Sequence, residues 1–98
     1  MNLNNVIFYE RYSKLDLHGY DQETARVAIC DFISDSMKLK QEVVVIVHGI
    51  GSGKIMRTTQ EVLKRHKDVL DYKSSFNNRG CTLVLLNKRG RQEWKYEK

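Results

Sequence analysis

The 98-residue chain is long enough for one domain and too short for two, because a chain of this size buries a single core. It has no apolar run of the length that a bilayer requires and no secretory leader, so we expect a soluble cytoplasmic protein without a membrane partner. Cys30 and Cys81 show no metal-ligand spacing, and we expect both to be reduced, small and buried.

Positive charge is concentrated in the second part of the chain. Residues 1–40 contain five Lys and Arg against six Asp and Glu, and residues 41–98 contain twelve against six, which adds up to the 17 and 12 of the whole chain. A basic half favours a polyanionic partner, because Lys and Arg that neutralise phosphates release counterions from a nucleic acid. A solvated surface is an equal explanation of the charge taken alone.

The first elements are a strand and a helix. Residues 15–18 alternate apolar and polar side chains, as in a strand with one buried face, and Gly19, Tyr20 and Asp21 supply a turn and a helix cap. The helix that follows carries apolar residues at three- and four-residue spacing. These residues are Ala25, Ala28, Ile29, Phe32, Ile33 and Met37.

A second strand and a second helix come next. Residues 42–47 are rich in β-branched side chains and stop at His48, which is typical of a parallel strand covered on both faces. After several glycines, apolar spacing over residues 55–63 predicts a helix that ends in the basic cluster at residues 64–67.

Two more strands complete the predicted order β-α-β-α-β-β. The weaker strand covers residues 69–76 and the stronger one residues 81–86, with a turn at residues 77–80. A strand, a helix and a strand in close succession imply a right-handed crossover between parallel strands. We therefore predict an α/β fold over residues 13–87, a single two-layer α/β sandwich with a mixed sheet and two helices.

Two terminal segments lie outside this unit. Residues 1–12 are an N-terminal extension, and residues 88–98 are a basic and aromatic C-terminal tail. The tail can bind phosphates and stack on bases, or it can be a disordered solubilising end.

Polar side chains gather at the expected ends of the two parallel strands. Asp16 and His18 share a face of the first strand, and the second strand ends in His48. Carboxyl ends of parallel strands coincide, and open α/β sheets bind ligands there. A lone Asp or His at a strand end is commonly a turn residue, but a turn explains the glycine of each His-Gly pair and not the histidine. We predict that the three side chains line one crevice and act in catalysis.

A glycine-rich loop joins the second strand to the second helix. Gly49, Gly51 and Gly53 alternate before Lys54 and Arg57, so backbone amides and the helix N-terminus can close on a phosphate. The spacing fits neither a Walker A loop nor a dinucleotide fingerprint, so ATP and NAD are not expected. A flexible turn would explain one or two of these glycines, but not three followed by basic residues that oppose the helix dipole. We predict that these five residues bind nucleic acid.

The two motifs resemble those of the Smr (small MutS-related) domain family. They are Leu-Asp-Leu-His-Gly at residues 15–19 and His-Gly-Ile-Gly-Ser-Gly at residues 48–53, and the resemblance covers about residues 13–87. It implies a compact α/β sandwich in a stand-alone member of the family. For many members it also implies endonuclease activity on DNA or RNA, and some members act at stalled or collided ribosomes. Asp16 and His18 carry over as the catalytic pair, and His48 with its three glycines carries over as the phosphate-contacting loop.

The sequence departs from the family pattern at three places. Ile50 stands where many members have a basic residue, Met56 stands where an arginine is common, and Gly80 alone remains of a segment that is usually glycine-rich. Lys54 and Arg57 are the candidate substitutes for the missing basic residues.

The first functional hypothesis is phosphodiester cleavage. His18 is the general base on the attacking hydroxyl, Asp16 orients it and keeps it basic, and His48 donates to the leaving oxygen or to a phosphate. Lys54, Arg57 and the loop amides stabilise the charge on the phosphate. RNA is favoured over DNA, because its 2′-hydroxyl is an internal nucleophile and the chain lacks the carboxylate cluster of a two-metal site. Asp16 can still hold one Mg²⁺ with the phosphate, so metal dependence stays open.

Two other hypotheses remain. A non-catalytic module that docks on RNA or the ribosome is motivated by the departures from the family pattern. The other is a small-molecule enzyme that holds a phosphorylated substrate in the glycine loop. It is the least favoured hypothesis, because it does not explain the basic second half and tail. In each case we expect a monomer.

Overall fold

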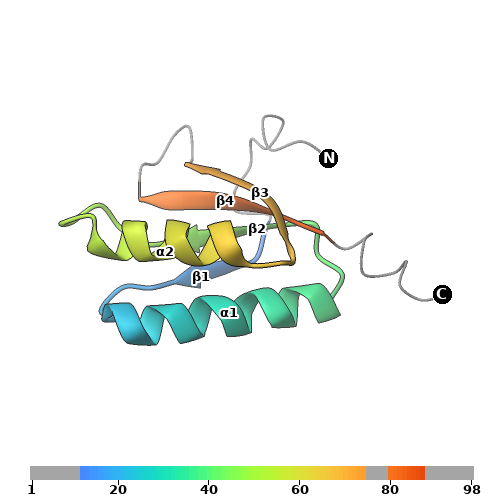
Figure 1. The fold of residues 1–98 in the computed structure, drawn as a ribbon, viewed down its shortest axis with the longest axis horizontal. Helices are drawn as coiled ribbons and strands as arrows, with labels where there is room; N and C mark the ends of the chain where they lie inside the picture. Colours follow the sequence, from blue (N-terminus) through green and yellow to red (C-terminus); the bar gives the residue numbers. More distant parts are fainter. Residues whose placement is uncertain (1–11, 75–79, 88–98) are drawn as a thin grey trace.

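A computed structural model of the chain describes residues 12–74 and 80–87, and its elements follow the predicted order (Figure 1). The predicted tail, and most of the predicted extension and of the turn before the last strand, lie outside the described residues. In the part of the chain that is described, no helix is both long and apolar enough to cross a bilayer. The elements are β1 (Lys14–Asp16), α1 (Gln22–Lys38), β2 (Val43–Val47), α2 (Lys54–Arg65), β3 (Val69–Ser74) and β4 (Cys81–Leu86).

The strands form one mixed sheet in the order β1-β2-β4-β3. β1 is parallel to β2, and β4 is antiparallel to both β2 and β3. The connections from β1 through α1 to β2 and from β2 through α2 to β3 therefore step across the sheet in the same direction. Right-handed connections of this kind place both helices on one face, where Figure 1 shows them. The predicted α/β sandwich with a mixed sheet and two helices is confirmed.

The main core lies between the sheet and the two helices. Alternate residues of β2 and β4, among them Val44, Ile46 and Val84, meet buried residues of α1 and Leu63 of α2. On the opposite face of the sheet, the intervening residues form a second buried cluster, which consists of Val43, Val45, Cys81 and Leu83. The residues of β2 are therefore covered on both faces, as its run of β-branched side chains predicts.

The prediction that both cysteines are buried is correct for Cys81 and wrong for Cys30, which is exposed. Buried positions of α1 such as Ala25, Ile29 and Ile33 recur every four residues. Cys30 lies one residue beyond Ile29, which turns its side chain by about 100° around the helix axis and out of the apolar face. Both thiols are free, and burial raises the pKa of the Cys81 thiol.

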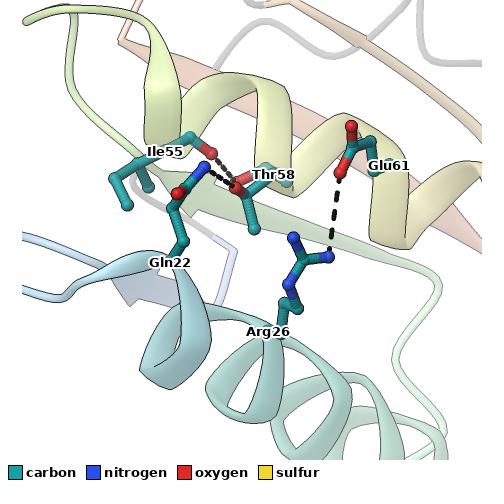
Figure 2. Close-up of polar contacts among 6 residues, drawn as sticks. Gln22, Arg26, Ile55, Thr58 and Glu61 are labelled. Carbon is teal, nitrogen blue, oxygen red and sulfur yellow. Dashed lines mark hydrogen bonds and ion pairs between the residues drawn. The ribbon is translucent and has the colours of Figure 1, made fainter.

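Two polar contacts join α1 to α2 (Figure 2). Nε2 of Gln22 donates to Oγ1 of Thr58 at 3.1 Å, and Nη1 of Arg26 lies 3.7 Å from Oε1 of Glu61. Both side chains of the ion pair are about half exposed, so the pair contributes little to stability. Thr58 is fully buried, and Gln22 is the first residue of α1. The Gln22–Thr58 hydrogen bond therefore helps to fix the N-terminal parts of the two helices against each other.

Candidate functional site

The candidate site lies where β1 and β2 end. Asp16 pairs with Val47 in parallel register, and the N–H of Leu17 donates to the carbonyl of Val47 at 2.8 Å. The segments that follow the two strands line a common cavity of about 500 Å³. Seven of the eight residues predicted for the site line it, and Arg57, which is exposed on α2, does not. The seven are Asp16, His18, His48, Gly49, Gly51, Gly53 and Lys54.

The carboxylate of Asp16 contacts the backbone of His18, not its imidazole. Oδ1 of Asp16 accepts a hydrogen bond from the N–H of His18 at 2.9 Å. β1 ends at Asp16, and the N–H of Tyr20 donates to the carbonyl of Leu17 at 3.0 Å, so the chain turns before strand alternation can bring the two side chains together. Asp16 therefore positions His18 through the main chain, which corrects the expectation that it orients the ring.

His18 is exposed to solvent and lines the cavity. Within residues 12–74 and 80–87, no side chain or backbone group is hydrogen-bonded to its imidazole ring. A neutral imidazole in such a position can accept a proton from a bound hydroxyl.

His48 has the opposite environment, with an exposed fraction of 8% and both ring nitrogens engaged. Nδ1 lies 2.8 Å from the carbonyl oxygen of Gly49, and Nε2 lies 2.8 Å from Oγ1 of Thr82. Because a carbonyl can only accept, Nδ1 carries a proton, and in the tautomer protonated at Nδ1 alone, Nε2 accepts a hydrogen bond from the hydroxyl of Thr82. Neither nitrogen remains for a substrate, so the geometry favours a positioning role over the expected proton donation.

The backbone beside His48 is tied to the start of β4. The N–H groups of His48 and Gly49 both donate to the carbonyl of Gly80, at 2.8 and 2.9 Å. Together with the His48–Thr82 contact, these bonds hold the beginning of the glycine loop against β4. Sequence reasoning missed Thr82. The available signal was a single hydroxyl in the otherwise apolar run of residues 81–86, since a buried polar group needs a partner.

The glycine loop has a backbone that other residues rarely adopt. Gly49 and Gly53 have φ values of 80° and 86°, a region that is strained for a residue with a Cβ. No atom lies within 4 Å of the position that a Cβ would occupy at either residue. The backbone conformation therefore requires these glycines, and the space beside them is open to a ligand.

The N-cap residue of α2, Gly53, has no side chain to cap the helix, and the first turn contains no acidic residue. α1 differs, because the carboxylate of its N-cap Asp21 accepts the N–H of Thr24 at 2.8 Å, which holds the pKa of Asp21 below its ordinary value. The N–H of Lys54 donates to Oγ of Ser52 at 3.4 Å, so α2 presents the next two N–H groups and its positive dipole end beside the exposed Lys54 side chain, which lines the cavity. This arrangement suits an anion such as a phosphate.

In the described part of the chain, no three His, Cys, Asp or Glu side chains come together in a group that could hold a metal ion. Asp16 offers a single carboxylate to the cavity. A carboxylate and a substrate phosphate are together sufficient for Mg²⁺, which usually keeps several waters.

We expect Thr82→Val to destabilise the protein, because it leaves the buried Nε2 of His48 without a partner while preserving the side-chain shape. The free energy of unfolding should fall by about 1–3 kcal/mol, measured by urea unfolding with circular dichroism. Thr59→Val is the matched control. Thr59 is also fully buried, but its hydroxyl donates to the carbonyl of Ile55, which the helix already uses, so a smaller loss is expected. Equal losses in the two variants would contradict the assigned His48–Thr82 contact.

The family model of the Smr domain matches residues 15–87 of the chain. Endonuclease MutS2 of Staphylococcus saprophyticus is 36% identical over 67 residues, and Endonuclease MutS2 of Staphylococcus carnosus is 34% identical over 67 residues. Each alignment covers 68% of this chain but only 9% of the relative.

Two solved structures share the fold. The Smr domain of Thermus thermophilus MutS2 superposes with a TM-score of 0.74 at 23% identity, covering 76% of this chain and 96% of that one. YdaL, a stand-alone small MutS-related protein from Escherichia coli, gives a TM-score of 0.71 at 25% identity, covering 78% of this chain and 65% of that one. The family model spans all but the first residue of the sheet-and-helix unit, and the chain belongs to the Smr domain family.

Proposed function

We propose that this Smr domain binds RNA in the cavity at the ends of β1 and β2 and cleaves it as an endonuclease. The observation that carries the proposal is that one cavity of about 500 Å³ is lined both by the exposed His18 and by the glycine loop. The relatives that are named endonucleases support the same class of reaction. The chain spans 9% of their length, so their activity motivates the proposal and does not replace its test.

A phosphate of the RNA lies against the N–H groups of the glycine loop that follow Gly49 and those of Ile55 and Met56 in the first turn of α2, since the N–H groups of Gly49 and Lys54 are already bonded within the protein. Lys54 adds a positive charge at the same end of the helix, and no acidic residue of the first turn opposes it. Preorganised donors of this kind stabilise the charge that gathers on the phosphate during cleavage. The hydrogen bonds of the His48 ring with Thr82 and Gly49 keep these donors in place before the substrate binds.

His18 is the general base of the reaction. Its ring takes the proton of the RNA 2′-hydroxyl, the 2′-oxygen forms a bond to phosphorus, and the bond from phosphorus to the 5′-oxygen of the next nucleotide breaks. The leaving oxygen takes a proton from water, because the Nδ1 proton of His48 is committed to Gly49. The hydroxide formed from that water takes the proton from His18, which restores the base. The products are a 2′,3′-cyclic phosphate and a 5′-hydroxyl. Mg²⁺ held by Asp16 and the phosphate would add charge neutralisation, and assays with Mg²⁺ and with EDTA decide whether it is required.

A binding module without cleavage is the second candidate function. Two observations favour it: the carboxylate of Asp16 does not touch the imidazole of His18, and Ile50 in the loop is an exposed apolar residue. Such a module would bind RNA through the same loop and would release no cyclic phosphate.

We expect His18→Ala to abolish cleavage without weakening binding. Loss of a general base lowers a rate by about 100-fold or more. The measurement is cleavage of end-labelled RNA, with the dissociation constant determined in parallel by fluorescence anisotropy. Replacing the 2′-hydroxyl at the cleaved position by hydrogen should have the same effect on the wild-type protein, because the internal nucleophile is removed.

Two matched variants make this test specific. His66→Asn removes a histidine outside the cavity but keeps an acceptor for the N–H of Asp68, so cleavage should be normal. Asp16→Asn keeps an oxygen for the N–H of His18 and should retain more activity than Asp16→Ala. If His18→Ala cleaves RNA at the normal rate, the proposed mechanism is refuted. If the wild type binds RNA but does not cleave it, the binding module is the better account.

We expect Lys54→Ala to weaken RNA binding and to flatten its salt dependence. The slope of log K against log salt should fall by about 0.7, the value for one phosphate contact with a single strand. Arg57→Ala should have a smaller effect, because Arg57 lies outside the cavity. Lys64→Ala is the matched control, since it removes the same charge from α2 about 15 Å away along the helix. Equal effects of Lys54→Ala and Lys64→Ala would indicate diffuse attraction in place of a phosphate site.

A further inference from the structure

Two apolar side chains remain exposed in the cavity that holds the phosphate loop. The described residues include five exposed large hydrophobic side chains, and two of them, Tyr20 and Ile50, line this cavity with exposed fractions of 38% and 67%. The half-buried Ile55 and Met56 line it as well. Scattered exposed apolar residues are ordinary, but their gathering beside a polar anion loop calls for a ligand that is partly charged and partly apolar.

The backbone on each side of Tyr20 is fixed. Its N–H closes a turn onto the carbonyl of Leu17 at 3.0 Å, and the next residue, Asp21, caps α1. Gly19 supplies the φ of 83° that the turn requires. A tyrosine ring on such a backbone offers a large flat surface at a low cost in conformational entropy, because it has few rotatable bonds.

Ile50 lines the same cavity from the glycine loop itself. It lies between Gly49 and Gly51, both with positive φ, and its side chain is the most exposed of the apolar residues in the cavity. A ligand bound to the loop amides would therefore have an apolar contact next to its anionic group.

We infer that Tyr20, with Ile50, forms a stacking site for an unpaired base of the RNA strand whose phosphate occupies the glycine loop. This inference rests on the proposed function and narrows its substrate class to single-stranded RNA. The phosphate and the base of one nucleotide are separated only by the sugar, so one nucleotide can reach both parts of the cavity. Aromatic side chains bind unpaired bases of any sequence in this way, because every base has a π-face.

A duplex does not suit this cavity. Its bases are stacked between their neighbours and present no free face to a tyrosine ring, and extruding one of them requires breaking pairing and stacking. The cavity volume of about 500 Å³ is that of a site for one small ligand, as expected for a single nucleotide. The domain should therefore select loops, bulges and single strands, with little dependence on sequence.

The test compares three RNA probes: a single-stranded oligoadenosine, a strand of the same length whose nucleotides lack bases, and a duplex. Wild-type protein should bind the oligoadenosine about tenfold more tightly than the baseless strand, the gain that stacking of one base provides. Tyr20→Ala should bind the two strands about equally, and Tyr20→Phe should keep the tenfold preference because the aromatic ring remains. Leu70→Ala, at an exposed apolar residue outside the cavity, is the matched control and should also keep it.

The outcomes separate this inference from the proposed function. If wild type and Tyr20→Ala prefer the oligoadenosine over the baseless strand by the same factor, and binding still depends on salt, the stacking site is overturned. The proposed phosphate site is not contradicted by that result. Tighter binding of the duplex than of the oligoadenosine also overturns the stacking site. Failure of the wild type to bind any of the three probes at low salt refutes the proposed function itself, and the stacking site with it. Thermal unfolding of each variant shows whether the fold is intact.

Discussion

The parallel pairing of β1 with β2 determines where every residue of the candidate site lies. β1 has only three residues, and its position depends on the register from Lys14–Val45 to Asp16–Val47 and on the hydrogen bond from Leu17 to Val47. The α1 crossover makes this pairing possible and packs over it. Because the two strands end together, the turn after β1 and the glycine loop after β2 line a single cavity. A shift of one residue in the register would turn Asp16 to the other face of the sheet.

The two His-Gly pairs at this edge have different physical roles although their sequences are the same. His48 is buried, and both of its ring nitrogens are hydrogen-bonded, to Gly49 and to Thr82, which holds the start of the glycine loop against β4. His18 is exposed, its backbone is held by Asp16, and its ring stays available for proton transfer. The proposed function assigns the loop to binding and His18 to proton transfer, a division that follows from the burial of the two histidines and not from residue type.

Patterns within single elements predicted the fold and the cavity in which most of the candidate residues meet. The β-branched run of β2, the helical spacing of α1 and the alternating glycines were sufficient to place seven of the eight predicted residues in one cavity. Hydrogen-bond partners could not be predicted, because Thr82 is 34 residues from His48 and the turn at Leu17 changes the direction of the chain at His18. The exposure of Cys30 could have been predicted, since it lies outside the four-residue spacing of the buried face.

The most direct test of the account is to observe which backbone amides respond to RNA. Single-stranded oligoadenosine is titrated into ¹⁵N-labelled protein, and the chemical shifts of the amides are followed by NMR. The account predicts the largest changes at His18, Tyr20, Gly49, Gly51 and Gly53, with little change in β3, which contributes no residue to the cavity. Changes that concentrate on β3 while the glycine loop stays silent would contradict the central claim that this cavity binds nucleic acid.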